Sequence, residues 1–324
     1  MAYETIAIRK LSPAIGAEVS GVDLASLSNQ QASELHDALM AHQVLFFRDQ
    51  QMSVDQHKAF GRLFGDLLVH PAARAEVEDH PEIRVVHADE KTKVATGEVW
   101  HSDMSCEPEP PMGSILYLHQ SPPVGGDTAF ANMYLAYETL SEPIKRLVEG
   151  LSAFHTSAHV YSRGEYDRSD KKFPEAVHPI VRTHPVTERK CLFVNRGFTK
   201  RIEGLKKHES DALLEMLVRH GETPEFQCRF RWERHSVAFW DNRCAMHRAT
   251  FDYHPHVRHG HRVTIKGDRP FESRFRGGEP HHHHLTLRSR AKRGVSKGGP
   301  QSWCCPPFET RPAGAPQGEV ILFP

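Results

Sequence analysis

Short apolar runs separated by turn residues recur along most of the chain. Such runs, rich in β-branched and aromatic residues and bounded by Gly, Pro, Asn or Asp, are typical of buried strands. The runs cover residues 44–47, 83–86, 114–118, 180–182, 191–194, 226–232 and 236–240. A hairpin is indicated around residues 185–190. The pattern predicts a mainly β fold with α insertions, namely a double-stranded β-helix, or jelly roll.

Helical periodicity appears between these runs, in four segments. They cover residues 28–42, 53–64, 132–151 and 209–220. Ser28 is a predicted N-cap, and Pro143 interrupts the third segment. In the second segment, Phe60, Leu63 and Phe64 are predicted to share one packed side. These helices are expected to cover the sheet.

The composition changes near Phe271, after which Gly, Pro, Arg and Ser dominate and periodic apolar residues vanish. We expect one domain over residues 1–270 and a disordered tail without catalytic residues over 271–324. The tail includes a run of four histidines, His281 to His284, which can bind metal nonspecifically. Residues 161–175 are polar and aperiodic, which predicts a surface loop, with a lid over the active site as the alternative.

The overall composition predicts a cytoplasmic protein and excludes several classes of partner. Among 324 residues, Lys plus Arg and Asp plus Glu each number 41, so no basic footprint for nucleic acid or an anionic membrane exists. The apolar runs are too short to span a bilayer, and the first residues show no signal-peptide pattern. The six cysteines form no Cys-x-x-Cys pair, which favours reduced thiols over a disulfide framework.

The strongest chemical signal is the segment Trp100-His101-Ser102-Asp103, with His247 far downstream. Two imidazoles and one carboxylate can occupy one face of an octahedral metal, which is the 2-His-1-carboxylate pattern of non-haem Fe(II) oxygenases. Asp103 and His247 are 144 residues apart, too far for a local metal-binding loop. Only a fold could bring these ligands together.

Other histidines compete for this assignment, because the chain contains 24. A second His-x-Asp motif, His87-Ala88-Asp89, follows an apolar run, and its simplest interpretation is a solvated strand end. Periodicity alone leaves the choice between the two motifs open. Four histidines after His247 intersperse with Pro and Gly and are predicted to lie in a solvated loop. These are His254, His256, His259 and His261.

Several blocks, in order, resemble the taurine dioxygenase family of Fe(II)/2-oxoglutarate-dependent oxygenases, over roughly residues 5–272. Blocks in a fixed order are more specific than a single motif. They are Ile15–Leu24, Val44–Arg48, Trp100–Asp103, Gly125–Thr128, Leu192–Thr199, Trp240–His247 and His261–Asp268. The resemblance implies that His101, Asp103 and His247 hold the ferrous iron.

The same resemblance implies roles for two arginines that follow His247 by 11 and 15 residues. Arg258, with the Thr128 hydroxyl, would bind the distal carboxylate of the cosubstrate 2-oxoglutarate. Arg262 would lie nearer the metal, touching the cosubstrate and the anionic end of the substrate. Arginine suits both roles because its planar fork pairs bidentately with carboxylates and sulfonates. Four residues apart on an extended segment, the two side chains should share one face.

His70 and Phe198 match positions that contact the sulfonated substrate in the taurine enzyme. A departure from the family pattern is Gly97, where that enzyme has a substrate-binding Asn. The alternatives are a loop histidine before Pro71 and simple core packing of Phe198.

The implied reaction is hydroxylation of a small anionic substrate with O2, coupled to formation of succinate and CO2. Taurine or a related alkylsulfonate is expected, with release of sulfite. An alkyl sulfate ester or an aryloxyalkanoate is the alternative, and a non-catalytic jelly-roll protein that binds metal and ligand is a more remote one. Because members of this family tend to form homo-oligomers, the resemblance implies a homo-oligomer here.

Overall fold

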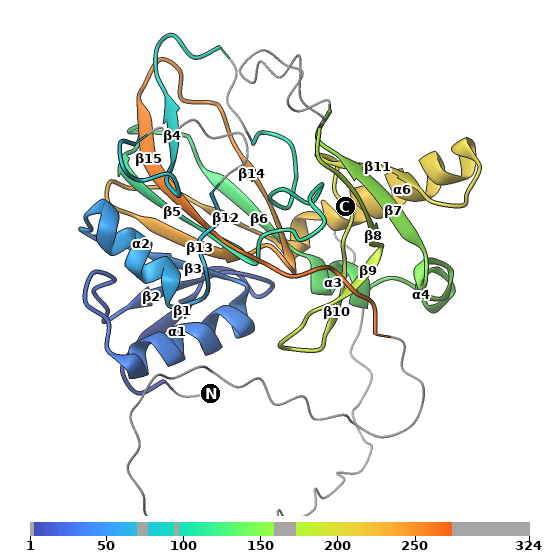
Figure 1. Cartoon of the computed structure of the whole chain (residues 1–324), viewed down its shortest axis with the longest axis horizontal. Coiled ribbons are helices and arrows are strands. Elements are labelled where there is room, and N and C mark those ends of the chain that lie inside the picture. Colours follow the sequence, from blue (N-terminus) through green and yellow to red (C-terminus); the bar gives the residue numbers. More distant parts are fainter. Residues whose placement is uncertain (1–2, 70–76, 94–96, 159–172, 274–324) are drawn as a thin grey trace, which may run out of the picture. The chain divides into compact units, whose positions relative to one another are not determined.

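Two β-sheets that face each other form the centre of the part of the chain described here. This computed structural model describes residues 3–69, 77–93, 97–158 and 173–273, all within the unit Met1–Phe275. The larger sheet has the strand order β1-β2-β3-β13-β5-β15-β4, and the smaller has β12-β6-β14 (Figure 1). Two further small sheets, β11-β7-β8 and β10-β9, lie beside them.

The strands and helices have the following bounds. The larger sheet contains β1 (Ala7–Lys10), β2 (Ala17–Ser20), β3 (Val44–Phe47), β4 (Arg84–Ala88), β5 (Gly113–Gln120), β13 (Val237–Asp241) and β15 (Arg258–Ile265). The smaller contains β6 (Thr128–Asn132), β12 (Gln227–Phe230) and β14 (Ala245–Ala249). The other strands are β7 (Ser152–Thr156), β8 (Glu175–Pro179), β9 (Val181–Thr183), β10 (Lys190–Leu192) and β11 (Thr199–Ile202). The α-helices are α1 (Asn29–His42), α2 (Val54–Arg62), α3 (Met133–Glu138), α4 (Glu142–Val148) and α6 (Lys207–Gly221).

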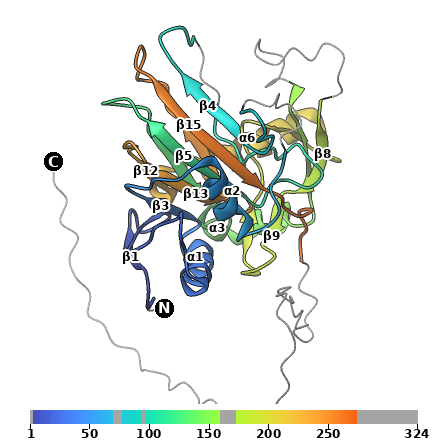
Figure 2. The ribbon, with the colours of Figure 1, turned by 60° about the vertical axis from the view of Figure 1, so that its left-hand side comes forward.

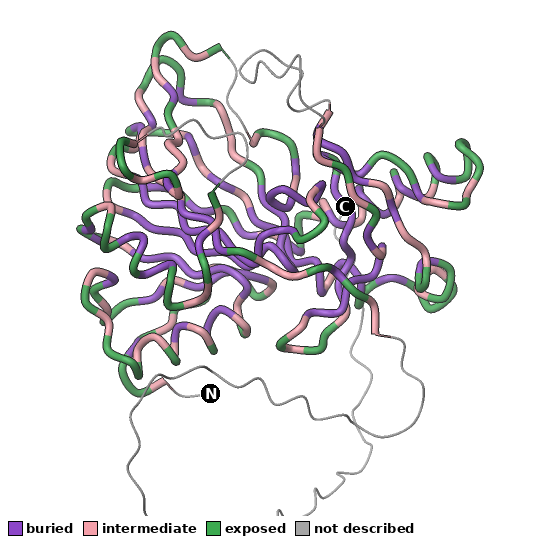
Figure 3. Tube along the Cα trace, in the orientation of Figure 1, coloured by how far each residue is buried: buried purple, intermediate pink, exposed green. Residues whose placement is uncertain are grey.

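Both faces of the larger sheet are buried, which explains its continuous apolar runs. On β13, Val237 and Phe239 pack in the cluster that α1 and α2 cover, while Ala238 and Trp240 pack in the cluster between the two sheets. Side chains of a strand alternate between faces, so a strand buried on both sides must be apolar throughout. Figure 2 shows α1 and α2 along one side of this sheet, and Figure 3 shows the buried segments concentrated in the strands.

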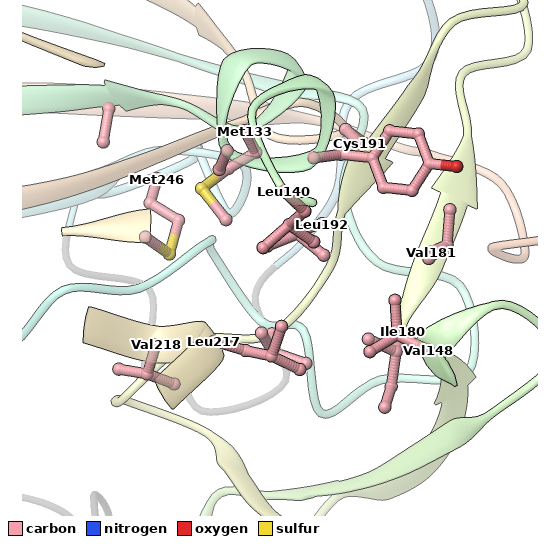
Figure 4. Close-up of a cluster of buried hydrophobic side chains, with 14 of the residues drawn as sticks. Met133, Leu140, Val148, Ile180, Val181, Cys191, Leu192, Leu217, Val218 and Met246 are labelled. Atoms are coloured by element: carbon pink, nitrogen blue, oxygen red, sulfur yellow. The ribbon is translucent and has the colours of Figure 1, made fainter. Parts of the chain in front are cut away.

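A third apolar cluster lies on the outer face of the smaller sheet. It joins Met246 of β14 and Met133 of α3 to Leu217 and Val218 of α6 and to Leu192 of β10 (Figure 4). This cluster fixes the helical insertion against the sheet that carries His247.

The predicted helices are confirmed, with two corrections in detail. Ser28 caps α1 in a reciprocal capping box with Gln31. Helix α2 ends at Arg62, so Leu63 is 54% exposed, and the prediction that it packs beside Phe60 is wrong. Pro143 lies in the first turn of α4, where its missing N–H is not needed, and the break precedes it.

The prediction of a solvated loop is correct for His254 and His256 but wrong for His259 and His261. The latter two belong to β15, which pairs with β4 on one side and β5 on the other. The strand begins at Arg258, and its first residues are polar on both faces, so no apolar alternation marks it.

The chain after β15 stays packed against the unit. The buried Arg182 donates two hydrogen bonds to the Asp268 carboxylate, at 2.9 and 3.0 Å, and the Thr183 N–H donates to the Phe271 carbonyl at 2.7 Å. His70, residues 161–172 of the predicted loop or lid, and the tail from residue 274 lie outside the described residues. Among the described helices, none is long and apolar enough to cross a membrane.

Candidate metal and cosubstrate site

His101, Asp103 and His247 converge at one end of the space between the two sheets. The Asp103 Oδ1 lies 3.7 Å from His101 Nε2 and 3.9 Å from His247 Nε2, and the three donor atoms lie within 4.8 Å of one another. The backbone explains this proximity. His101 N donates to His247 O at 3.0 Å, and His247 N donates to His101 O at 2.8 Å, which fixes the His-x-Asp segment beside β14.

The protonation states favour metal coordination by all three groups. Burial lowers the pKa of His247 to about 3 and also lowers that of His101, so both rings are neutral near pH 7. His101 Nδ1 lies 2.7 Å from the Val99 carbonyl, so it carries the proton and leaves Nε2 as a free lone pair. Burial alone would raise the pKa of Asp103, but the Arg262 charge, with the hydrogen bond from Ser114, holds it well below its ordinary value.

A buried polar network orients the Asp103 carboxylate through its Oδ2 atom. Ser114 on β5 donates to Asp103 Oδ2 at 2.7 Å, and Asn242 Nδ2 donates to the Ser114 hydroxyl at 3.2 Å. The Asn242 Oδ1 in turn accepts from Asp103 N at 3.2 Å and from Trp240 Nε1 at 3.0 Å. Sequence reasoning did not find Ser114, because an isolated serine in an apolar strand carries no recognisable signal.

Arg262 lies at the predicted metal cluster, where its guanidinium donates to Asp103 Oδ1 at 2.9 Å. This is the carboxylate oxygen that faces both histidines. The Arg262 Nε is buried and has no hydrogen-bond partner among the described residues. The side chain therefore keeps donors available next to the three candidate ligands.

Arg258 is a buried cation that no carboxylate of the described residues neutralises. Its guanidinium lies over the Trp232 ring, 5.5 Å from the centroid, and its Nε has no partner. Trp232 Nε1 donates to the Thr128 hydroxyl at 2.9 Å, so the predicted Arg258 and Thr128 flank one indole. A buried, unpaired guanidinium is costly and calls for an anionic ligand, which fits a dicarboxylate cosubstrate.

Arg258 and Arg262 share one face of β15, as the sequence predicts. The register of β15 with β4 is continuous from Arg258 to Arg262, so alternate residues point the same way. Val263 and Ile265 pack toward α2, which places both arginines on the face toward the smaller sheet.

Phe198 lies beside the metal cluster, with its ring edge-to-face to His101 and centroids 6.2 Å apart. A Cβ placed on Gly97 would lie 3.5 Å from His101 Cε1, so residue 97 also borders this ring. A molecule bound next to His101 would therefore contact both Phe198 and residue 97.

A second group of possible ligands, His184, Asp241 and Cys244, is fully buried. His184 Nε2 bonds Asp241 Oδ2 at 3.1 Å, and its Nδ1 accepts from the N–H groups of Val186 and Thr187. Asp241 is also paired with Arg243. Because no lone pair of His184 is free, this group is a structural network.

A cavity of about 690 Å³ opens on the opposite face of β6 and β14 from His247. It is lined by Trp100 and Arg248 among others, and by none of the three candidate ligands. Its Arg196 and Arg229 are already paired with acidic residues. The cavity is therefore separate from the metal and cosubstrate groups.

Comparisons with known proteins point to one enzyme family. The model of the family described as "Taurine catabolism dioxygenase TauD, TfdA family" matches residues 7–264. A putative alpha-ketoglutarate-dependent sulfonate dioxygenase from Schizosaccharomyces pombe is 34% identical, over 82% of this chain and 70% of that protein. An alkylsulfatase from Acinetobacter baylyi is also 34% identical, over 82% and 86%.

Among solved structures, a putative alpha-ketoglutarate-dependent taurine dioxygenase from Burkholderia xenovorans superimposes with a TM-score of 0.73. It is 38% identical and covers 82% of this chain and 94% of its own. The similarity therefore spans both sheets and the insertions.

Proposed function

This chain belongs to the TauD, TfdA family of taurine catabolism dioxygenases, which use Fe(II) and 2-oxoglutarate, and from that premise we propose the roles of its residues and its substrate. His101, Asp103 and His247 hold the ferrous ion. The observation that carries this assignment is the convergence of their three donor atoms within 4.8 Å. The donor set, two neutral imidazoles and one carboxylate, suits Fe(II) and leaves half of an octahedral sphere open.

Arg258 binds the distal carboxylate of 2-oxoglutarate, assisted by Thr128. This role is supported by the burial of the guanidinium without a protein counter-charge and by the shared Trp232 contact. A carboxylate bound there would form two charge-assisted hydrogen bonds with the Arg258 guanidinium, and these would compensate for the water that the guanidinium loses on burial.

Arg262 orients the proximal end of the cosubstrate and the substrate anion. Its 2.9 Å hydrogen bond to Asp103, a proposed metal ligand, supports this role. Iron and 2-oxoglutarate, when bound, supply the activation of O2 that oxidises a substrate C–H bond, while the protein orients the substrate and excludes water. Phe198 supplies one apolar wall of this space, and His70 would contribute a hydrogen bond to the anion.

The substrate is a small organic anion, and we favour taurine or a related alkylsulfonate, hydroxylated next to sulfur with release of sulfite. Alkyl sulfate esters and aryloxyalkanoates stay as alternatives, because a sulfonate dioxygenase, an alkylsulfatase and a phenoxypropionate dioxygenase are each 34% identical to this chain. Gly97 leaves more room beside His101 than the Asn of the taurine enzyme, which would allow a related alkylsulfonate larger than taurine.

Two finer features belong to the same proposal. We expect the seven-stranded and three-stranded sheets to form a jelly roll, as the strand pattern predicts, and the chain to be cytoplasmic, as its composition predicts. The family resemblance implies a homo-oligomer.

The binding chemistry can be tested without knowing the substrate. Anaerobic addition of Fe(II) and 2-oxoglutarate should produce a weak visible metal-to-ligand charge-transfer band. His247→Ala should abolish the band, whereas His256→Ala, which changes an exposed histidine outside the site, should retain it. No band in the unaltered protein would favour the non-catalytic binding protein.

The substrate class can then be assigned from turnover. Succinate formation should be measured with sulfonates, sulfate esters and aryloxyalkanoates in parallel. Sulfite release with a sulfonate is the expected outcome, and turnover of aryloxyalkanoates alone would contradict the sulfonate assignment.

A further inference from the structure

A group of histidines lies on the opposite face of β15 from Arg258 and Arg262. His259 and His261 alternate with the two arginines along the strand, and they share the side on which Val263 and Ile265 pack toward α2. His119 of β5 joins them at a bulge, since Gln120 pairs with His259 and Leu118 pairs with Gly260. A bulge redirects the side chain of its extra residue. We call His119, His259 and His261 the β15 histidine cluster.

The donor atoms of two cluster members are close together. His119 Nε2 lies 3.2 Å from His261 Nδ1, with ring centroids 4.5 Å apart. The His259 ring lies 5.6 Å from that of His261 and 5.9 Å from that of His119. All three residues are partly exposed, so an ion from solvent can reach them.

We propose that the β15 histidine cluster is a second metal site, which binds a divalent transition metal such as Zn²⁺ through His119 Nε2 and His261 Nδ1, with His259 as a third ligand. Two imidazole nitrogens bound to one zinc at about 2.0–2.1 Å are about 2.9–3.4 Å apart for bond angles between square and tetrahedral. The observed 3.2 Å lies within this range. Nitrogen-only donors select zinc, copper, nickel or cobalt over magnesium or calcium.

The cluster presents neutral rings at physiological pH. Burial, with the neighbouring His261, His259 and His235, lowers the pKa of His119 to about 4. Burial and neighbouring histidines also lower the pKa values of His259 and His261. Neutral imidazole is the form that binds metals.

His259 has a nitrogen that is free to bind a metal, because its Nδ1 is buried and has no hydrogen-bond partner among the described residues. The ligand atoms of His119, His259 and His261 do not all lie within 4.8 Å of one another, unlike those of His101, Asp103 and His247. His259 would therefore complete the site by a side-chain rotation, and water would fill the remaining positions.

The surroundings explain why the pair is held in place. On β5, the Tyr117 ring packs against His119 with centroids 4.4 Å apart, and its hydroxyl bonds His235 Nδ1 at 2.8 Å. His57 of α2 also packs edge-to-face with Tyr117, with ring centroids 6.0 Å apart. His87 of β4 lies 5.3 Å from His259, also between ring centroids.

Zinc binding by equilibrium dialysis and elemental analysis tests the proposal. The full-length chain should first carry H281Q, H282Q, H283Q and H284Q, so that the tail histidines do not contribute. In this parent, the double variant H119Q/H261Q should lose one equivalent of zinc. H247A should retain that equivalent, which separates this site from the proposed iron site.

H259Q should weaken binding at this site by about tenfold or more, because losing even an indirect partner of a metal ligand costs about 10–100-fold. H256Q is the matched control, since it changes an exposed histidine near the start of β15, and it should bind as the parent does. The proposal is overturned if H119Q/H261Q binds as much zinc as the parent, which would mean that the 3.2 Å contact is only a hydrogen bond.

A second measurement does not depend on the variants folding. Crystals of the parent soaked in Zn²⁺ should show an anomalous peak between His119 and His261. A peak at the proposed iron site, with no density between these two rings, would contradict the proposal.

Discussion

At the scale of single residues, the site depends on charges and donors that the protein leaves incomplete. The Arg258 guanidinium is buried without an anionic partner among the described residues, and the Asp103 carboxylate is held by Ser114 on one side and Arg262 on the other. The unpaired Arg258 charge lowers the stability of the ligand-free protein, and an anionic ligand would compensate for it.

Arg258→Met should therefore weaken the binding of 2-oxoglutarate without lowering the stability of the protein. Removing an unpaired buried charge should leave the melting temperature of the ligand-free protein unchanged or higher. The affinity for 2-oxoglutarate should fall by about 100-fold or more, because a buried charge-assisted pair contributes about 3 kcal/mol. Calorimetric melting and titration of the charge-transfer band check the two effects, and unchanged 2-oxoglutarate affinity would exclude the proposed role.

Ser114→Ala should weaken iron binding while the fold is retained. The variant removes the hydrogen bond to Asp103 Oδ2, and losing such a partner typically costs about 10–100-fold in metal affinity. Ser20→Ala, at an exposed strand end, is the control. Equal Fe(II) affinities in the two variants would show that Ser114 does not orient the ligand.

At the scale of elements, β15 connects several features of the molecule. Its arginines face the smaller sheet, its histidines face α2, and its neighbours β4 and β5 fix its register. The two strands β15 and β5 leave no room for a side chain at Gly260, where a Cβ would lie 2.2 Å from the Tyr117 carbonyl oxygen.

Gly260→Ala should displace β15 from β5 and so move Arg258 and Arg262. We expect a loss of about 3 kcal/mol or more in the free energy of unfolding, the upper end for overpacking because backbone must shift, together with weaker 2-oxoglutarate binding. Gly204→Ala is the comparison, since its φ of +79° is strained but no atom lies within 4 Å. It should cost about 1–2 kcal/mol without changing binding. Urea unfolding and 2-oxoglutarate titration of both variants test this, and equal losses would contradict the crowding argument.

At the scale of the whole molecule, neutral buried histidines set the response to acid. Burial lowers the pKa of His57 and of His155 to about 3, and that of His178 to about 4. The unfolded chain binds these protons near pH 6.5, whereas the folded chain does not.

The free energy of unfolding of the metal-free protein should therefore fall as the pH drops from about 6.5 toward 4. Each proton taken up on unfolding contributes a slope of about 1.4 kcal/mol per pH unit. His57→Gln removes one such proton, so it should reduce the slope by about 1.4 kcal/mol per pH unit. His256→Gln, which changes an exposed histidine, should leave the slope unchanged. Urea unfolding at pH 7, 6 and 5 provides the measurement, and a pH-independent stability would refute the argument.

Local patterns in the sequence were sufficient for the helices and for several of the buried strands, such as β3, β5 and β13. The reciprocal bond between Ser28 and Gln31, and the alternation of Val237 to Trp240, involve neighbours in the chain. Such interactions depend on composition and spacing, so the sequence alone determines them. The family blocks also identified His101, Asp103 and His247 before their positions were known.

Only the tertiary structure decided which distant groups meet. The reciprocal backbone bonds of His101 and His247, the ion pair of Asp103 with Arg262, and the 3.2 Å approach of His119 to His261 join residues far apart in sequence. Polar residues of β15 carry no apolar alternation, so their strand is recognisable only from its pairing with β4 and β5. Contacts of this kind depend on sheet register and strand order, which no local pattern encodes.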